Sequence, residues 1–311
     1  MNAVDFAALP AFRVGHAQDL DAKTGCTVIL CPQGAVCGVD VRGGSPATRD
    51  TDALHPTANR KHVHAILLTG GSSFGLAAAD GVMRFLEQQR IGRDVGVTKI
   101  PNVVAAALFD LKCGRSDVRP DAAMGVAACE HALLEQPVQL GGYGAGAGAS
   151  IGKSYGMECA MPGGVGAALL RQGALLVGAV AAVNCVGDVV RQGEILAGAR
   201  DTAGRFLDCE AAILRKYAAN QDFFTTNTNQ EGENTILVCV MTNANLNKAE
   251  MTRIAAQGQN GIARAVRPAH SLYDGDVVFA ASSGEINAGQ DAVGILAARA
   301  VEEAVQRAVV G

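Results

Sequence analysis

The feature that most constrains the fold of this chain is an abrupt change of composition near residue 234. Residues 217–234 (YAANQDFFTTNTNQEGEN) contain no Val, Ile or Leu and are rich in Asn, Gln and Thr, whereas the next six residues are TILVCV. The first stretch is typical of an exposed, mobile loop and the second of a buried β-strand. The chain is therefore expected to pass from solvent into the core at one peptide bond, Asn234–Thr235.

The overall composition is that of a globular protein with ample material for a core. Of 311 residues, 49% are hydrophobic and 18% are charged, and the net charge is −4. No segment gathers Lys and Arg as a nucleic-acid surface requires, so no nucleic-acid partner is expected. No apolar run is long enough to span a bilayer, and the first residues lack the pattern of a secretory signal, so no membrane association is expected either.

Cysteine usage indicates a reducing compartment. The nine Cys are an odd number, form no C-x-x-C motif and mostly lie inside apolar runs. This pattern predicts buried, reduced thiols in a cytoplasmic protein. The six His are scattered, which favours structural or surface roles over zinc ligation, so neither a metal nor a cofactor is expected.

The first part of the chain has the pattern of a β-hairpin followed by a strand and a helix. Cys26–Cys31 and Ala35–Val41 are apolar and β-branched, and Pro-Gln-Gly joins them, which is a hairpin signal. A short buried strand is expected over 65–69. A helix should follow, capped by Ser72 or Ser73. Its inner face would hold Phe74, Ala78, Val82, Phe85 and Leu86.

The rest of the chain alternates apolar strands with helical patterns. Strands are expected at 166–170, 174–183, 235–240 and 277–280. Asn247 and Glu250 have the spacing of a capping box, which predicts a helix starting near Lys248. A long apolar periodicity predicts a final helix. This order predicts an α/β or α+β domain with a partly antiparallel sheet.

Thr235 has the position of a nucleophile, although the local sequence also fits a simpler role. A rigid strand holds its first residue with little freedom. If its hydroxyl attacked the preceding carbonyl, the Asn234–Thr235 bond would break through an ester, and the freed α-amine could then act as general base for the same hydroxyl. Taken alone, however, an Asn-Thr pair fits an ordinary β-branched residue that opens a strand.

Several longer motifs occur in a fixed order from about Arg13 to the C-terminal helix. They are VRGG (41–44), LLTGGSSFGLAAADGV (67–82), RPDAAMG (119–125), GAGASIGK (146–153), AVNCVGD (182–188), GENTILVCVMTNA (232–244) and YDGD (273–276). In these motifs the chain resembles the L-aminopeptidase/D-esterase (DmpA-type) family of N-terminal-nucleophile hydrolases, which includes β-peptidyl aminopeptidases and nylon-oligomer hydrolases.

The resemblance implies a role for each matching residue. Thr235 matches the nucleophile, and Asn234–Thr235 matches the self-cleavage site. Asn184 matches an oxyanion donor, and Lys153 matches a lysine that contacts the nucleophile. Asp274 and Asp276 match a pair that orients the nucleophile and its amine.

One position departs from the family pattern. Phe109 stands where some family aminopeptidases carry a Tyr in the substrate pocket, so a hydroxyl that could stabilise the tetrahedral intermediate is missing. The departure affects transition-state stabilisation and substrate preference, but not the nucleophile.

The resemblance further implies a layered αββα sandwich in one domain of residues 1–311. Self-cleavage would yield chains of residues 1–234 and 235–311, which are expected to stay together because the short chain cannot bury a core alone. The implied activity is that of an aminopeptidase or amidase on small amides, peptides or esters, in a homo-oligomer such as a tetramer.

Two other functions remain as alternatives. Residues 147–154 (AGASIGKS) fit a loose P-loop pattern with Ala in place of the first Gly, which would make the protein a nucleotide-binding NTPase with Lys153 on the phosphates. The strand and acidic partner that such a loop requires are poorly represented nearby. The third possibility is a non-catalytic protein with the family fold, which would not cleave itself.

Overall fold

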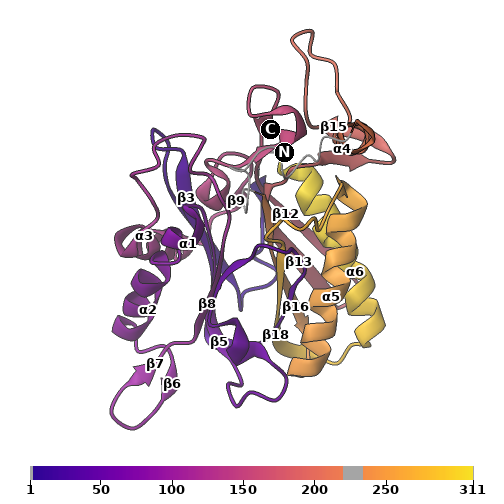
Figure 1. Cartoon of the computed structure of the whole chain (residues 1–311). Helices are drawn as coiled ribbons and strands as arrows, with labels where there is room; N and C mark the ends of the chain where they lie inside the picture. Colours follow the sequence, from indigo (N-terminus) through magenta and orange to yellow (C-terminus); the bar gives the residue numbers. More distant parts are fainter. Residues whose placement is uncertain (1–2, 220–233, 311) are drawn as a thin grey trace.

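Two β-sheets lie face to face between two groups of helices, with α2 and α3 on one side and α5 and α6 on the other (Figure 1). This computed structural model describes residues 3–219 and 234–310. The layered αββα architecture expected from the sequence is therefore confirmed. The polar stretch that precedes Thr235 falls largely on residues 220–233, outside the described residues, while its first two residues, Tyr217 and Ala218, end helix α4.

The strands of the two sheets form one hydrogen-bonded path in the order β12-β13-β16-β18-β3-β5-β8-β4, and β2 pairs with β3. The bounds of these strands are β2 Arg13–Asp19, β3 Thr24–Val41, β4 Ala47–Arg49, β5 Val63–Thr69, β8 Val103–Ala107, β12 Gly164–Gln172, β13 Leu175–Asn184, β16 Thr235–Ala244 and β18 Val277–Ile286. Shorter strands lie outside this path: β1 Ala3–Val4, β6 Arg93–Asp94, β7 Lys99–Ile100, β9 Val138–Gln139, β10 Ser150–Ile151, β11 Met161–Pro162, β14 Asp188–Arg191, β15 Glu194–Ala197 and β17 Val266–Arg267.

The helices cover the outer faces of the two sheets. Their bounds are α1 Ser72–Gly75, α2 Ala78–Gln88, α3 Ala122–Ala132, α4 Cys209–Ala218, α5 Lys248–Ala265 and α6 Gln290–Arg307, with 3₁₀ turns η1 Thr51–Leu54, η2 Gly144–Gly146 and η3 Lys153–Tyr155. Among residues 3–219 and 234–310, no helix is long and apolar enough to cross a membrane.

Strand β3 joins the two sheets, which corrects the expected hairpin. Its first half pairs with β2 and β5, and its second half, Val36–Val41, pairs with β18. The residues Pro32-Gln33-Gly34 do not reverse the chain but lie within β3, where the register with β5 shifts. Pro32-Gln33-Gly34 therefore mark an irregularity within β3, and the predicted hairpin turn is wrong. The two halves of β3 pair with other strands, β2 and β5 on one side and β18 on the other, instead of with each other.

Three hydrophobic cores follow from the alternation of side chains along the strands. In β16, Leu237, Cys239 and Met241 point into the core between the two sheets, whereas Ile236, Val238 and Val240 pack toward α5 and α6. A third core lies between the first sheet and helices α2 and α3. Because both faces of the central strands are buried, these strands are continuously apolar rather than alternating.

The helix predicted after the 65–69 strand is divided and capped differently from the expectation. Gly71, in a left-handed conformation, precedes the single turn α1, and no side chain caps α1 or α2. Phe74 is exposed and stacks under the guanidinium of Arg119 rather than packing inward. The predicted inner-face residues of α2 itself, Ala78, Val82, Phe85 and Leu86, are buried.

The second half of the chain follows the sequence prediction closely. The strands expected at 166–170, 235–240 and 277–280 lie within β12, β16 and β18, and the strand expected at 174–183 corresponds to β13, which starts one residue later. The predicted capping box of α5 is present, since Asn247 Oδ1 accepts from Glu250 N at 3.0 Å and Glu250 Oε2 accepts from Asn247 N at 2.7 Å.

Helix α5 packs so closely on β3 that one position has no room for a side chain. A Cβ on Gly38 would lie 2.2 Å from the backbone nitrogen of Thr252 in α5. We expect Gly38→Val to lower the free energy of unfolding by about 1–3 kcal/mol or more, because an overpacked core must distort.

Denaturant unfolding followed by circular dichroism would measure this loss. Gly142→Ala is the matched control, because a Cβ at Gly142 would have nothing within 4 Å. Equal stability of the two variants would contradict the close contact between α5 and β3.

Candidate active site

Thr235 is held between two neighbouring strands at the first position of β16. It pairs with Asn184, the last residue of the antiparallel strand β13, and on the other side β16 runs parallel to β18. Thr235 shares the side-chain face of Leu237, so it points into the space between the two sheets. Only 2% of its surface is exposed.

The peptide bond before Thr235 is surrounded by groups that can take part in its cleavage. Thr235 Oγ1 donates a hydrogen bond to the carbonyl oxygen of Asn234 over 2.5 Å. The same carbonyl oxygen accepts the backbone N–H of Gly275 over 2.7 Å. A hydroxyl and a donor therefore both meet the carbonyl group of the predicted cleavage site.

Asn184 and Lys153 form a buried pair beside Thr235. Lys153 Nζ lies 3.0 Å from Asn184 Oδ1 and 3.3 Å from its carbonyl oxygen. Ser150 N donates to the same Oδ1 over 3.0 Å, while Asn184 Nδ2 donates to the carbonyl oxygen of Phe109 over 2.9 Å. The side chain of Asn184 is thus oriented by contacts at both of its ends.

The loop that holds Lys153 does not have the architecture of a P-loop. Residues 147–154 run through the two-residue strand β10 into the 3₁₀ turn η3, whereas a phosphate-binding loop connects a buried strand to an α-helix. Lys153 is 6% exposed and its ammonium group is turned inward to Asn184.

Asp274 and Asp276 lie at the start of β18, next to the start of β16. Asn234 bridges to Asp274, and Asp276 Oδ1 accepts the N–H of Ile236 over 2.7 Å. Asp274 Oδ2 accepts the N–H of Ser271 over 2.6 Å. The acidic pair therefore flanks the predicted cleavage site on both sides of Thr235.

Burial makes Asp274 costly to charge. It raises the pKa of Asp274 to about 7, the negative charge of Asp276 adds to the rise, and the Ser271 hydrogen bond and the positive charge of Lys153 oppose it. Burial lowers the pKa of His270, but its hydrogen bond to Asp276 and the charge of Asp276 outweigh burial, so the pKa lies above its usual value.

Phe109 follows β8 in the other sheet and reaches the site from across the core. It lines a narrow pocket together with Lys153, Ser150, Cys113 and Met157. The structure therefore brings the residues singled out from the sequence together: Thr235, Asn234, Asn184, Lys153, Asp274, Asp276 and Phe109 are linked by hydrogen bonds, strand pairing or a shared pocket.

Four contacting residues were not singled out as site residues from the sequence. Ser150 and Ser271 use backbone N–H groups, as does Gly275, and His270 Nδ1 lies 2.8 Å from Asp276 Oδ2. Because every residue except proline has a backbone N–H, the residue type does not reveal which N–H groups donate at the site. His270 stands six residues before its partner, a spacing that indicates no particular structure, so only the folded loop reveals the contact.

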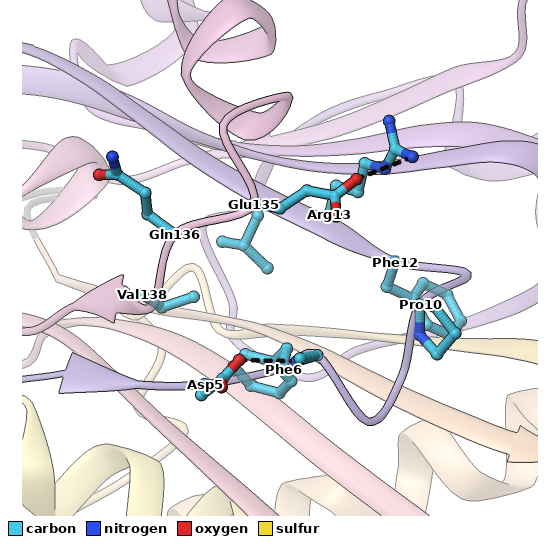
Figure 2. A pocket seen from close by; sticks show the side chains of 10 residues that line it. Asp5, Phe6, Pro10, Phe12, Arg13, Glu135, Gln136 and Val138 are labelled. Carbon is cyan, nitrogen blue, oxygen red and sulfur yellow. Dashed lines mark hydrogen bonds and ion pairs between the residues drawn. The ribbon is translucent and has the colours of Figure 1, made fainter.

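A larger pocket lies elsewhere in the molecule (Figure 2). The N-terminal segment and the residues after α3 line it, and Arg13 pairs with Glu135 over 2.9 Å at its edge. None of the predicted site residues lines this pocket.

Solved structures share this fold. The L-aminopeptidase D-Ala-esterase/amidase of Ochrobactrum anthropi, described as a variant of the Ntn hydrolase fold, superimposes with a TM-score of 0.68 at 19% identity, covering 99% of this chain and 86% of that one. A β-aminopeptidase of Burkholderia sp. superimposes with a TM-score of 0.63 at 22% identity over 99% and 86% of the two chains. The fold is therefore that of the Ntn hydrolases.

Sequence relatives span most of the chain. An uncharacterized aminopeptidase of Mycobacterium leprae (strain TN) is 38% identical over 305 residues, which is 93% of this chain and 80% of the relative. The 6-aminohexanoate-oligomer endohydrolase of Paenarthrobacter ureafaciens is 32% identical over 279 residues, 89% of this chain and 74% of that protein. The family pattern described as peptidase family S58 matches residues 7–311. The chain belongs to peptidase family S58.

Proposed function

We propose that this protein is a self-processing hydrolase that cleaves its own Asn234–Thr235 bond and then uses Thr235 as the nucleophile on small amides, peptides or esters. Membership of the family makes the chain an aminopeptidase or amidase, and the nucleotide-binding alternative is not favoured. The observation that carries the proposal is the buried hydroxyl of Thr235, which lies 2.5 Å from the carbonyl oxygen of Asn234 at the start of β16.

In self-cleavage, Thr235 Oγ forms a bond to the carbonyl carbon of Asn234, and its proton passes to the departing nitrogen. The C–N bond breaks and an ester remains between Asn234 and the Thr235 oxygen. Water then adds to the ester carbon, which releases the Asn234 carboxylic acid and returns the proton to Thr235 Oγ. The products are residues 1–234 and residues 235–311.

In turnover, the new α-amine of Thr235 serves as general base for its own hydroxyl. Asn184 would supply an amide donor near the reacting carbonyl, and Lys153 holds the Asn184 side chain in place over 3.0 Å. Asp274 and Asp276 flank the amine and would orient it. An amide or ester substrate passes through an acyl-Thr235 intermediate, which water hydrolyses.

The two products are expected to remain associated. Strand β16 of the short chain lies between β13 of the long chain and β18. Helix α6 packs on β12 and β13 of the long chain, and helix α5 packs on β3. Separating the chains would expose these packed surfaces to water, which is strongly unfavourable.

Two further parts of the proposal concern the setting of the enzyme. The nine Cys are free thiols, seven of them buried, which fits a reducing cytoplasm. Assembly into a homo-oligomer such as a tetramer is proposed from the family resemblance alone.

Replacing the nucleophile should block both reactions. We expect Thr235→Ala to remain one full-length chain without hydrolase activity, because one hydroxyl performs both steps, and Thr235→Ser to retain part of each. Intact mass would show chains starting at Met1 and Thr235 for the parent and one chain for the Ala variant. Two chains in the Ala variant with the same junction would refute Thr235 as the cleaving group.

The raised pKa of Asp274 predicts a pH-dependent stability of the uncleaved chain. Below pH 4 the carboxyl is neutral in the folded and unfolded states. As the pH rises from about 4 to about 7, the carboxyl ionises in the unfolded chain but stays largely neutral in the folded one, so folding loses stability through this window and the loss is complete above about pH 7. In the Thr235→Ala background, Asp274→Asn should therefore raise the melting temperature at pH 8 and change it little near pH 4.

Thermal melts between pH 4 and 8.5 would test this sign. The exposed Asp21 supplies the control, since Asp21→Asn should leave the pH profile of the Thr235→Ala chain unchanged. A melting-temperature difference for Asp274→Asn that stays constant with pH would contradict a raised pKa.

The mature enzyme should require a free amino group on the acyl side of its substrate and prefer small residues there. Asp274 and Asp276 can hold an ammonium group, and acetylation of the substrate amine would leave a buried carboxylate unpaired. We expect kcat/KM for alanine p-nitroanilide to be more than tenfold higher than for its N-acetylated form. Acetylation should cost on the order of 2–5 kcal/mol of transition-state stabilisation.

Equal rates on the two anilides would indicate a more general amidase or esterase. Such an outcome has a structural reason, because the amine of Thr235 competes for the same carboxylates and Phe109 makes the pocket less polar than a Tyr would. Thr235 would remain the nucleophile in that case.

A further inference from the structure

We propose that the main-chain N–H of Gly275 is the oxyanion donor for self-cleavage, and that the lack of a side chain at Gly275 gives the nucleophile its room. This inference rests on the proposed function. The N–H of Gly275 donates to the carbonyl oxygen of Asn234 over 2.7 Å, and this oxygen gains the negative charge when Thr235 attacks. An N–H at this distance stabilises that charge directly.

The donor is fixed before the reaction begins. Gly275 is buried, and the loop around it is tied to residues 42–45 on its far side. Ser45 N donates to the carbonyl oxygen of Asp274 over 2.9 Å, and Arg42 N donates to that of Asp276 over 3.0 Å. Because the backbone on both sides of Gly275 is held, its N–H needs no reorganisation as charge develops.

The side chain of Asn184 is engaged elsewhere in the uncleaved chain. Its Nδ2 donates to the carbonyl oxygen of Phe109, and its Oδ1 accepts from Ser150 and Lys153. The hydrogen bond that reaches the Asn234 carbonyl from the protein backbone comes from Gly275. The geometry thus gives self-cleavage a donor of its own at the carbonyl that reacts.

The nucleophile occupies the space where a side chain of residue 275 would begin. A Cβ on Gly275 would lie 2.6 Å from Thr235 Oγ1 and 2.9 Å from the carbonyl oxygen of Ser45. Any other residue would therefore push the hydroxyl away from the Asn234 carbonyl or displace the loop. The requirement for glycine here is one of space, since its φ lies outside the left-handed region.

The decisive experiment removes the N–H and leaves the side chain unchanged. Cell-free translation with a tRNA charged with glycolic acid would place an ester oxygen at position 275 of the full chain. We expect conversion to the two chains to slow about 100-fold or more, as for loss of one oxyanion donor. Intact mass separates cleavage before Thr235 from hydrolysis of the new ester before position 275.

The same substitution at Gly141 is the matched control. The Gly141 N–H donates to the carbonyl oxygen of Val165 over the same 2.7 Å and lies outside the predicted site. This chain should mature at nearly the parent rate. An ester at 275 that matures as fast as the ester at 141 would overturn the proposal.

A genetically encoded variant tests the space requirement. Gly275→Ala keeps the N–H but introduces the Cβ, so self-cleavage should slow at least tenfold while Gly142→Ala matures normally. Melting temperatures measured in the Thr235→Ala background show whether the variant folds. A folded Gly275→Ala chain that matures at the parent rate would refute the close approach of Gly275 to the nucleophile.

The outcomes separate this inference from the function on which it rests. If the parent chain never yields a fragment that begins at Thr235, the self-processing function itself fails. If the parent cleaves there and the ester at 275 has no effect, only the role of Gly275 fails.

Discussion

The pairing of β16 with β13 on one side and β18 on the other fixes the position of every group around Thr235. The antiparallel pairing sets the last residue of β13, Asn184, beside the first residue of β16. The parallel pairing sets the start of β18, with Asp274 before it, beside Asn234. Because the two faces of β16 pack in two different hydrophobic cores, a slip by one residue would move every side chain into the opposite core, where it would not fit.

The same burial creates an imbalance of charge that self-cleavage would relieve. Asp274 and Asp276 lie close together in the core, where their hydrogen bonds, Lys153 and His270 offset part of the cost of burying negative charge. Cutting the Asn234–Thr235 bond produces an ammonium group next to this pair. If the proposed cleavage occurs, the cleaved chain would gain an attraction that the uncleaved chain lacks, which would favour retention of the new N-terminus at the site.

Local sequence patterns predicted individual elements better than connections, and the layers were predicted from the family resemblance. Apolar runs such as 235–240 and the Asn247–Glu250 capping box depend on neighbouring residues, so local patterns suffice for them. The fate of Pro32-Gln33-Gly34 depends on β5 and β18, which are distant in the chain, and a hairpin was wrongly expected. The cap expected at Ser72 is wrong for a local reason, because the adjacent Gly71 takes a left-handed conformation and occupies the N-cap position.

The site residues were found through motifs, which record side chains and not backbone geometry. Thr235, Asn184, Lys153 and the two aspartates stand in recognisable sequence patterns. The N–H of Gly275 does not, although it makes the contact with the Asn234 carbonyl. Only the parallel pairing of β16 and β18, which joins segments some 40 residues apart, brings that donor to the reacting bond.

In the proposed mechanism, self-cleavage and substrate turnover would pass through the same kind of intermediate. The ester of self-cleavage is an acyl-Thr235 whose acyl group is the N-terminal chain, so its carbonyl carbon has the same covalent attachment as that of an acylated substrate. The site that hydrolyses one is therefore suited to hydrolyse the other. Under this proposal Asn234 would mark where the acyl residue of a substrate lies, between the start of β18 and the end of β13, and the acidic pair beside it would meet a substrate amine.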